Sequence, residues 1–220
     1  MPIFKKINKK FFKKWTPEMA YVLGFIYADG NIILTKRKTW FWSIQITDKN
    51  ILEQIKKTID SSHVISKKKK ILGQKQLYRL QIGSKEMCND LILLGLTPKK
   101  SKSLVFPEIA DKYLGDFIRG YFDGDGGVWL GDTHTDRNRS TFTISTYFTS
   151  GSKFFLLSLK DKFEKVGIIG GSLVTKKKGF DLKYSIKNSL LLYKFMYNGS
   201  CSLFLTRKKE KFKKYMTLRS

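Results

Sequence analysis

The sequence predicts an α+β fold in which one structural plan occurs twice. Residues 22–30 read VLGFIYADG and residues 118–126 read IRGYFDGDG, so each segment is an apolar helix pattern that ends in Asp-Gly. A similar order of strand and helix patterns follows both segments. Strands beside helices in this order are typical of α+β layers, with an antiparallel sheet in each half. We therefore expect a pseudo-two-fold tandem repeat of αββαββα.

The first half is expected to span residues 15–102. Its first helix follows Thr16, which suits the cap position, and Pro17 suits the first turn. Alternating and helical hydrophobic patterns predict the elements that follow. These are strands at 31–34 and 39–47, a helix after the cap residue Asp48, strands at 63–67 and 76–82, and a helix at 84–94.

The second half is expected to span residues 111–220, after a proline-containing linker at 103–110. Residues 1–14 are expected to form a basic N-terminal arm. The second half repeats the order of elements found in the first. It has strands at 127–130 and 141–149, a helix after the cap residue Ser150, strands at 171–176 and 181–187, and a helix at 188–198.

The charge balance indicates a polyanionic partner, because 43 Lys and Arg face only 18 Asp and Glu, a formal charge of +25. The lysines are spread along the chain, and no apolar run reaches membrane-spanning length, which argues against a membrane role. Two cysteines and two histidines are too few for a disulfide scaffold or a zinc site. We expect an intracellular protein, in a bacterial cytoplasm or an organelle, whose metal is held by oxygens.

Small residues stand four apart in both motif helices: Gly24 and Ala28 in the first, Gly120 and Gly124 in the second. This spacing places them on one helix face and lets two backbones approach closely. If the helices pack there, Asp29 and Asp125 meet at their C-terminal ends. Both the helix dipoles and the mutual repulsion of the carboxylates disfavour that arrangement.

A divalent cation offsets this repulsion, and Mg²⁺ accepts carboxylates, carbonyls and water. The expected ligands are the carboxylates of Asp29 and Asp125 and the helix-end carbonyls of Ala28 and Gly124. One Asp-Gly by itself more simply marks a helix end and a turn. Its repetition in the same context favours a metal site, whose chemistry suits phosphodiester hydrolysis.

The two segments resemble the LAGLIDADG motifs of homing endonucleases, and the surrounding order of elements is similar to that family's fold across nearly the whole chain. Motif one departs at its sixth position, where Tyr27 replaces Asp, and Ile118-Arg119 replaces the leading Leu-Ala of motif two. Asp29 and Asp125 occupy the eighth position, which holds the family's metal-binding carboxylate.

The resemblance implies a single-chain enzyme of the two-motif form, whose sheets form a DNA-binding saddle around centrally packed motif helices. We expect a monomer, because the two halves of one chain already complete the site. It implies Mg²⁺-dependent double-strand cleavage at a long target, with Mn²⁺ as a substitute and Ca²⁺ binding without supporting cleavage. The family also uses a basic residue after each half's last strands to polarise the phosphate or water. Lys100 and Lys208 suit that role, and a solvated surface position is the open alternative for each.

Strand alternation predicts which side chains face double-stranded DNA, where Gln and Arg suit base edges. In the first half these are Thr35, Arg37, Ser43, Gln45, Thr47, Arg79 and Gln81. In the second half they are Arg139, Thr141, Thr143, Ser145, Tyr147 and Lys183, with Asp181 on the same face. The lysine runs at hairpin tips favour phosphate contacts by Lys67, Lys68, Lys176 and Lys177.

Two other functions remain open at this point. A DNA-binding regulator could keep the fold without cleavage, although both motif acids are present here. An RNA maturase that assists intron splicing would also use a basic sheet surface, so intron RNA is a second possible partner, and both roles can coexist. A free-standing or intron-encoded gene fits this compact chain better than an intein.

Overall fold

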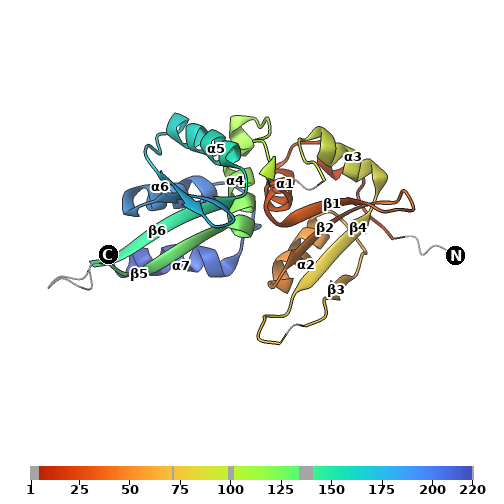
Figure 1. Ribbon diagram of the computed structural model, residues 1–220, viewed down its shortest axis with the longest axis horizontal. Helices are drawn as coiled ribbons and strands as arrows, with labels where there is room; N and C mark the ends of the chain where they lie inside the picture. The colour runs from red at the N-terminus through yellow and green to blue at the C-terminus, as the bar shows by residue number, and fades with distance from the viewer. Residues whose placement is uncertain (1–4, 71, 99–101, 134–140, 220) are drawn as a thin grey trace.

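The computed structural model describes residues 5–70, 72–98, 102–133 and 141–219. Two similar halves lie side by side along its long axis, with α1 and α4 at the centre (Figure 1). The first half comprises η1 (Phe11–Lys13), α1 (Pro17–Asp29), β1 (Gly30–Leu34), β2 (Trp40–Ile46), α2 (Lys49–Thr58), β3 (Ile65–Lys67), β4 (Tyr78–Gly83) and α3 (Lys85–Leu93). The second comprises α4 (Asp111–Asp125), β5 (Gly126–Thr133), β6 (Thr141–Ser150), α5 (Lys153–Lys165), β7 (Ser172–Lys176), β8 (Gly179–Tyr184), α6 (Ile186–Tyr197) and α7 (Thr206–Thr217).

Each half contains a four-stranded antiparallel sheet, in the orders β1-β2-β4-β3 and β5-β6-β8-β7. The two orders are equivalent, which confirms the predicted pseudo-two-fold α+β repeat. Alternation along the central strands explains the two faces of each sheet. Trp42 and Ile44 are fully buried and Gln45 is exposed, while in β6 Ile144 and Phe148 are buried between half-buried neighbours.

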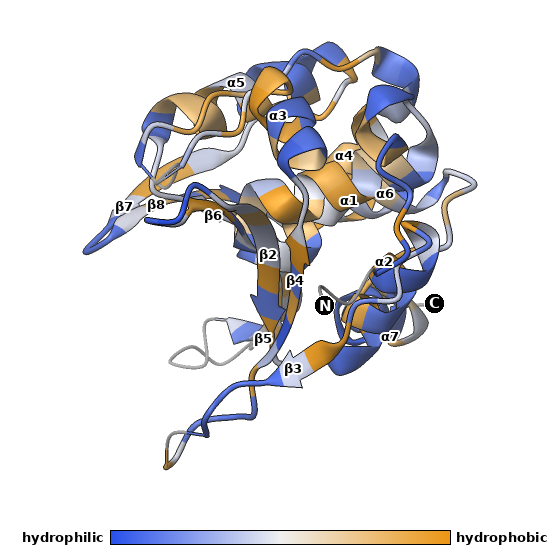
Figure 2. Ribbon diagram, turned by 90° about the vertical axis from the view of Figure 1, so that its right-hand side faces the viewer, coloured by the Kyte–Doolittle hydropathy of each residue, from blue (hydrophilic) through white to orange (hydrophobic). Residues whose placement is uncertain are grey.

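One face of each sheet therefore packs on helices, and we call the opposite face the open face. In Figure 2, α3 and α5 lie above the strands, α2 and α7 lie to their right, and no helix lies to the lower left of β2 and β5. The open face is where the sequence places the predicted contact residues. The other face is buried against the helices and forms part of the hydrophobic core.

The centre of the molecule is a close contact between α1 and α4. A Cβ atom added to Gly24 would lie 2.0 Å from the carbonyl oxygen of Phe117, and one added to Gly120 would lie 2.0 Å from that of Tyr21. No larger residue fits either position without moving backbone. The prediction that small residues let the two motif helices pack together is confirmed.

Two predicted details of the second half are wrong. Ser152 caps α5, because its Oγ accepts a hydrogen bond from the amide of Phe155 at 3.3 Å, whereas the Ser150 hydroxyl accepts one from the amide of Ser152. The strand expected at 181–187 ends at Tyr184. In the first half, Thr16 caps α1 as expected, and Asp48 precedes α2 without a side-chain capping bond.

The helix α7 was not predicted. Six of its twelve residues are Lys or Arg, and its buried residues are Lys208, Phe212 and Tyr215, so its apolar stripe is thin. It packs against β5 and holds a residue of the candidate site. The N-terminal arm also differs from a free tail, because Phe12 is 3% exposed and packs edge-on against Trp42. In the described part of the chain, no helix is long and apolar enough to cross a membrane.

Candidate metal centre and nucleic-acid interface

The two motif aspartates lie at the adjoining ends of the central helices. Asp29 is the last residue of α1 and Asp125 the last of α4, and both are half-buried. A Cβ atom added to Gly124 would lie 2.3 Å from the Cβ of Ala28 and 3.4 Å from a carboxylate oxygen of Asp29. The helix ends are therefore in contact, as the spacing of small residues predicted.

Both aspartates act electrostatically on the same neighbours. Burial raises the pKa of Tyr121, and the charges of Asp125 and Asp29 raise it further. Burial lowers the pKa of Lys208 to about 8, while Asp123, Asp29 and Asp125 favour its charged form. Asp29 and Asp125 therefore both lie close enough to Tyr121 and Lys208 to influence them.

The donor chemistry at this point suits a hard divalent cation. Among the described residues, no three His, Cys, Asp or Glu side chains converge to hold a metal. A cation between Asp29 and Asp125 would therefore complete its shell with carbonyls and water, and Mg²⁺ characteristically keeps several waters. The residues present fit Mg²⁺ better than zinc.

Lys208 reaches this site from α7 and is 5% exposed. Its Nζ donates to the carbonyl oxygens of Phe122 at 2.6 Å, Asp123 at 2.7 Å and Gly126 at 2.6 Å, and lies 3.4 Å from that of Gly124. These carbonyls belong to the C-terminal end of α4, where a cation is favourable. The structure therefore gives Lys208 an immediate role other than the expected one of polarising a phosphate: it caps the helix that carries Asp125.

Asp123, at the sixth position of motif two, is completely buried beside this lysine. One carboxylate oxygen accepts hydrogen bonds from the hydroxyl of Tyr21 and the amide of Leu205, both at 2.8 Å. Burial raises the pKa of Asp123 to about 6, and Lys208 is the largest influence in the opposite direction. Asp123 thereby links α1 and α4 to the start of α7.

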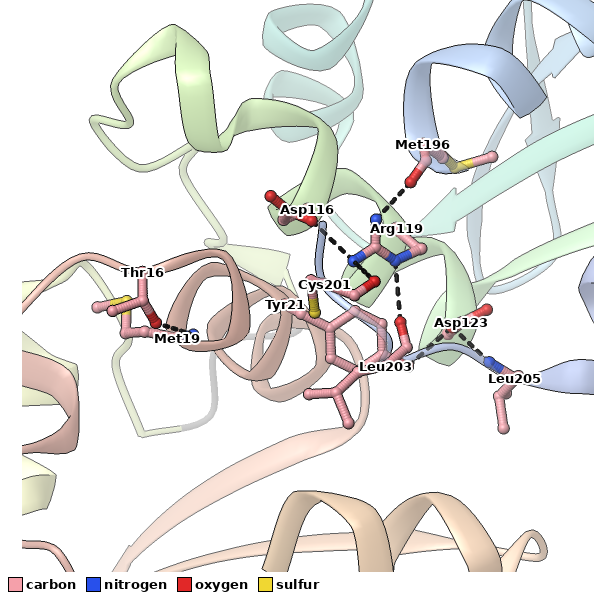
Figure 3. Close-up of polar contacts among 10 residues, drawn as sticks. All are labelled: Thr16, Met19, Tyr21, Asp116, Arg119, Asp123, Met196, Cys201, Leu203 and Leu205. Carbon is pink, nitrogen blue, oxygen red and sulfur yellow. Dashed lines mark hydrogen bonds and ion pairs between the residues drawn. The ribbon is translucent and has the colours of Figure 1, made fainter. Parts of the chain in front are cut away.

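Arg119 fixes the segment between α6 and α7 onto α4, as Figure 3 shows. It is 1% exposed, forms an ion pair of 2.7 Å with Asp116, and donates to the carbonyls of Leu203 at 2.9 Å and Cys201 at 3.3 Å. It also donates to the carbonyl of Met196. The departure of motif two from Leu-Ala therefore supplies an anchor for the chain that leads to Lys208.

At the sixth motif position, where the second half has Asp123, the first half has Tyr27. Tyr27 is 1% exposed, and its hydroxyl donates to the carbonyl of Leu94, just after α3, at 2.6 Å. Lys100, the expected counterpart of Lys208, lies outside the described residues. The predicted pair of basic residues is thus described for one half only.

Most of the predicted DNA-contact residues lie accessible on the open face or at its hairpins. Those that are exposed or half-buried are Thr35, Arg37, Gln45, Thr47, Lys67, Lys68, Arg79, Gln81, Thr141, Thr143, Ser145, Tyr147, Lys176, Lys177 and Lys183. Arg139 lies outside the described residues. Ser43, which was expected to face the DNA, is not accessible. It is 2% exposed, because its short side chain lies on the central strand between the paired residues Asn31 and Gln81.

Asp181 explains the arrangement of two of these lysines. It is 2% exposed on β8, accepts a hydrogen bond of 2.8 Å from Thr149, and pairs with Lys176 at 2.9 Å and Lys183 at 4.0 Å. Sequence reasoning placed Asp181 on this face but missed that it holds the two cations. The only available signal was an isolated acid among lysines.

A family model described as a LAGLIDADG-like domain matches residues 16–90. An uncharacterised protein of Methanocaldococcus jannaschii is 26% identical over 121 residues, which cover 51% of this chain and 40% of that relative. The matched region is therefore less than half of the relative's length.

Solved structures share the fold of nearly the whole chain. The LAGLIDADG meganuclease I-AabMI bound to uncleaved DNA is 15% identical, with a TM-score of 0.62 over 93% of this chain and 90% of that one. The homing endonuclease I-WcaI bound to its DNA recognition sequence is 19% identical, with a TM-score of 0.59 over 92% and 90%. I-SmaMI bound to an uncleaved DNA target with calcium ions is 12% identical, with a TM-score of 0.61 over 93% and 90%.

Proposed function

The chain has the single-chain, two-motif LAGLIDADG fold, and from that premise we propose that it is a site-specific DNA endonuclease. The observation that carries the proposal is the meeting of Asp29 and Asp125 at the ends of two closely packed helices. Folding alone gives no reason to bring two carboxylates to the negative ends of adjacent helix dipoles. A divalent cation held by both carboxylates would offset their repulsion.

We propose Mg²⁺ as the ion, with Asp29 and Asp125 as its side-chain ligands and the carbonyls of Ala28 and Gly124 as neighbouring donors. When bound, the ion would activate water and stabilise the leaving oxygen of the phosphodiester. The contribution of Lys208 is to hold the end of α4, and thus Asp125, in place. Of the four carbonyls near its Nζ, that of Gly124 is the most distant, so this oxygen is the least committed to the lysine.

The open faces of the two sheets provide the proposed DNA-binding surface. A two-stranded ribbon fits the major groove, and Gln45, Arg79 and Gln81 carry groups that read base edges. The hairpin lysines offer cations to phosphates, in keeping with the formal charge of +25. Because one chain supplies both aspartates, we propose a monomer that acts on a long, weakly symmetric site.

The test begins with random DNA duplexes selected for binding in Ca²⁺ and then exposed to Mg²⁺. We expect wild-type protein to cut both strands at one site. Asp29→Asn and Asp125→Asn should each retain binding and lose at least about 100-fold of cleavage, since even outer-shell partners of metals cost 10–100-fold when removed. Asp132→Asn, which changes an exposed carboxylate on β5, is the matched control and should cut normally.

The same experiment separates the alternatives. Sequence-selective binding without cleavage by the wild type would indicate a regulator that has kept the fold. Absence of selectivity for DNA would favour a maturase acting on intron RNA. Cleavage that survives both aspartate substitutions would contradict the shared metal site. A sedimentation mass corresponding to two chains on one duplex would contradict the monomer.

A further inference from the structure

Two apolar side chains project from the open face at equivalent positions in the two halves. Ile33 on β1 is 38% exposed and Trp129 on β5 is 43% exposed. Each follows its motif aspartate by four residues. Their predecessors, Ile32 and Val128, are each 4% exposed, so alternation along the strands directs the core residues inward and these two outward.

The surroundings of Trp129 hold its indole low on the sheet. A Cβ atom added to Gly131 would lie 2.7 Å from Cζ2 of Trp129, so the ring extends along β5 over this glycine. The residue paired with Trp129 on β6 is Ser145, whose side chain is short. In the first half Ile33 pairs with the half-buried Phe41. Each open face thus contains a low apolar patch.

Charge complementarity indicates what covers these patches. Cations lie on the same open faces, the exposed Lys183 on β8 and the half-buried Arg79 on β4, and the chain as a whole carries +25. An apolar protein partner would bring no negative charge to these cations. Duplex DNA places phosphates against the cations and base edges against the apolar side chains.

The position of the patches limits which base pairs they reach. A strand rises about 3.3 Å per residue, so four residues span about 13 Å, or at most about four base pairs of 3.4 Å. Of the four bases, only one presents an apolar group in the major groove to a side chain at this distance from the motif aspartates. That group is the methyl of thymine.

We propose that Ile33 and Trp129 are specificity-determining residues that contact thymine methyl groups, one in each half-site, within about four base pairs of the centre of the target. The inference rests on the proposed function, because it requires DNA on the open face. Each half of the protein should therefore prefer thymine at one position of its own half-site, and the two preferences can be tested separately.

The test removes a single methyl group from the DNA. Wild-type protein first selects its target in Ca²⁺, and each thymine within four base pairs of the centre is then replaced by deoxyuridine. We expect one such replacement in each half-site to weaken binding about fourfold, the value of one buried CH₂ group. With Trp129→Ser, which leaves no methyl group, the replacement in the second half's site should have no effect, while the other keeps its fourfold effect. Ile33→Ser should show the reverse.

Each variant is therefore the control for the other half-site. Val166→Ser, at the end of α5, removes an apolar side chain of the same 43% exposure and should leave both effects intact. Gly131→Ala keeps Trp129 but displaces its ring, and should reduce the effect in the second half-site only. A wild type that selects no sequence would overturn the proposed function and this inference together. A selective wild type that is indifferent to deoxyuridine would overturn the inference alone.

Discussion

The two halves of the molecule attach their closing segments to the motif helix by different chemistry. In the first half, the neutral hydroxyl of Tyr27 donates to the carbonyl of Leu94. In the second, the carboxylate of Asp123 accepts from the amide of Leu205. The difference follows from what the closing segment offers: a carbonyl requires a donor, and an amide requires an acceptor. The sixth motif position is therefore complementary to its partner, which explains how Tyr replaces Asp without loss of the fold.

The choice of an acid in the second half has further consequences. A buried carboxylate requires compensating charge, and Lys208 and Arg119 both favour the charged form of Asp123. The same cations cap α4 and fix the chain before α7. The second half consequently depends on a connected set of buried charges, and the described part of the first half depends on one hydrogen bond at the equivalent place.

The largest expected effect on stability comes from Arg119→Met. The substitution leaves Asp116 buried without its partner and removes donors from the carbonyls of Met196, Cys201 and Leu203. Breaking a buried ion pair in this way costs about 3–5 kcal/mol of unfolding free energy. Urea unfolding measures it. A loss below 1 kcal/mol would show that the second half does not depend on this anchor.

Asp123→Asn tests the buried acid through its pH dependence. The pKa of Asp123 is about 6 in the folded protein, above its ordinary value of 3.8, so the native state holds this proton to higher pH than the unfolded state. Its contribution to stability is therefore present below pH 4 and is lost as pH rises through 6, by about 3 kcal/mol for a pKa raised from 3.8 to about 6.

The unfolding free energy of wild type minus that of Asp123→Asn should accordingly decrease as the pH rises from 4 to 6. Subtracting the variant's curve removes the titration of all other groups. Asp132→Asn, at an exposed position, is the control and should run parallel to wild type across that range. A parallel curve for Asp123→Asn as well would mean that the acid is already compensated.

Lys208→Met separates a structural role of this lysine from a purely catalytic one. Met fills similar space without a donor, and the carbonyls of Phe122, Asp123 and Gly126 lose the lysine as a donor. The carbonyl of Phe122 still accepts from the amide of Gly126. We expect a loss of about 2 kcal/mol of unfolding free energy, typical of hydrogen bonds to a charged group. Unchanged or higher stability, combined with lost cleavage, would instead indicate that Lys208 acts only in catalysis and does not stabilise the fold.

Much of this comparison was predictable from the sequence, and the missing parts have physical causes. The repeated Asp-Gly motif and the small residues at Gly24 and Gly120 predicted the central helix pair, because their spacing directly determines how backbones pack. Nothing local to Arg119 indicates its carbonyl partners, which lie 77 to 84 residues away along the chain. Only its ion-pair partner Asp116 is a neighbour in the sequence. The helix α7 escaped prediction because its lysines obscure a narrow apolar stripe.

Tyr27→Phe is the smallest expected effect and completes the comparison between the halves. It removes one neutral hydrogen bond, to the carbonyl of Leu94, and leaves the buried ring in place. The expected loss is about 1 kcal/mol, several times smaller than that of Arg119→Met. Hydrogen exchange of the α3 amides should increase while that of α7 stays unchanged. Because the hydroxyl bears no charge, the loss should be constant from pH 4 to pH 8, unlike that of Asp123→Asn. A pH-dependent loss would show that the two halves are coupled through the central helices rather than attached independently.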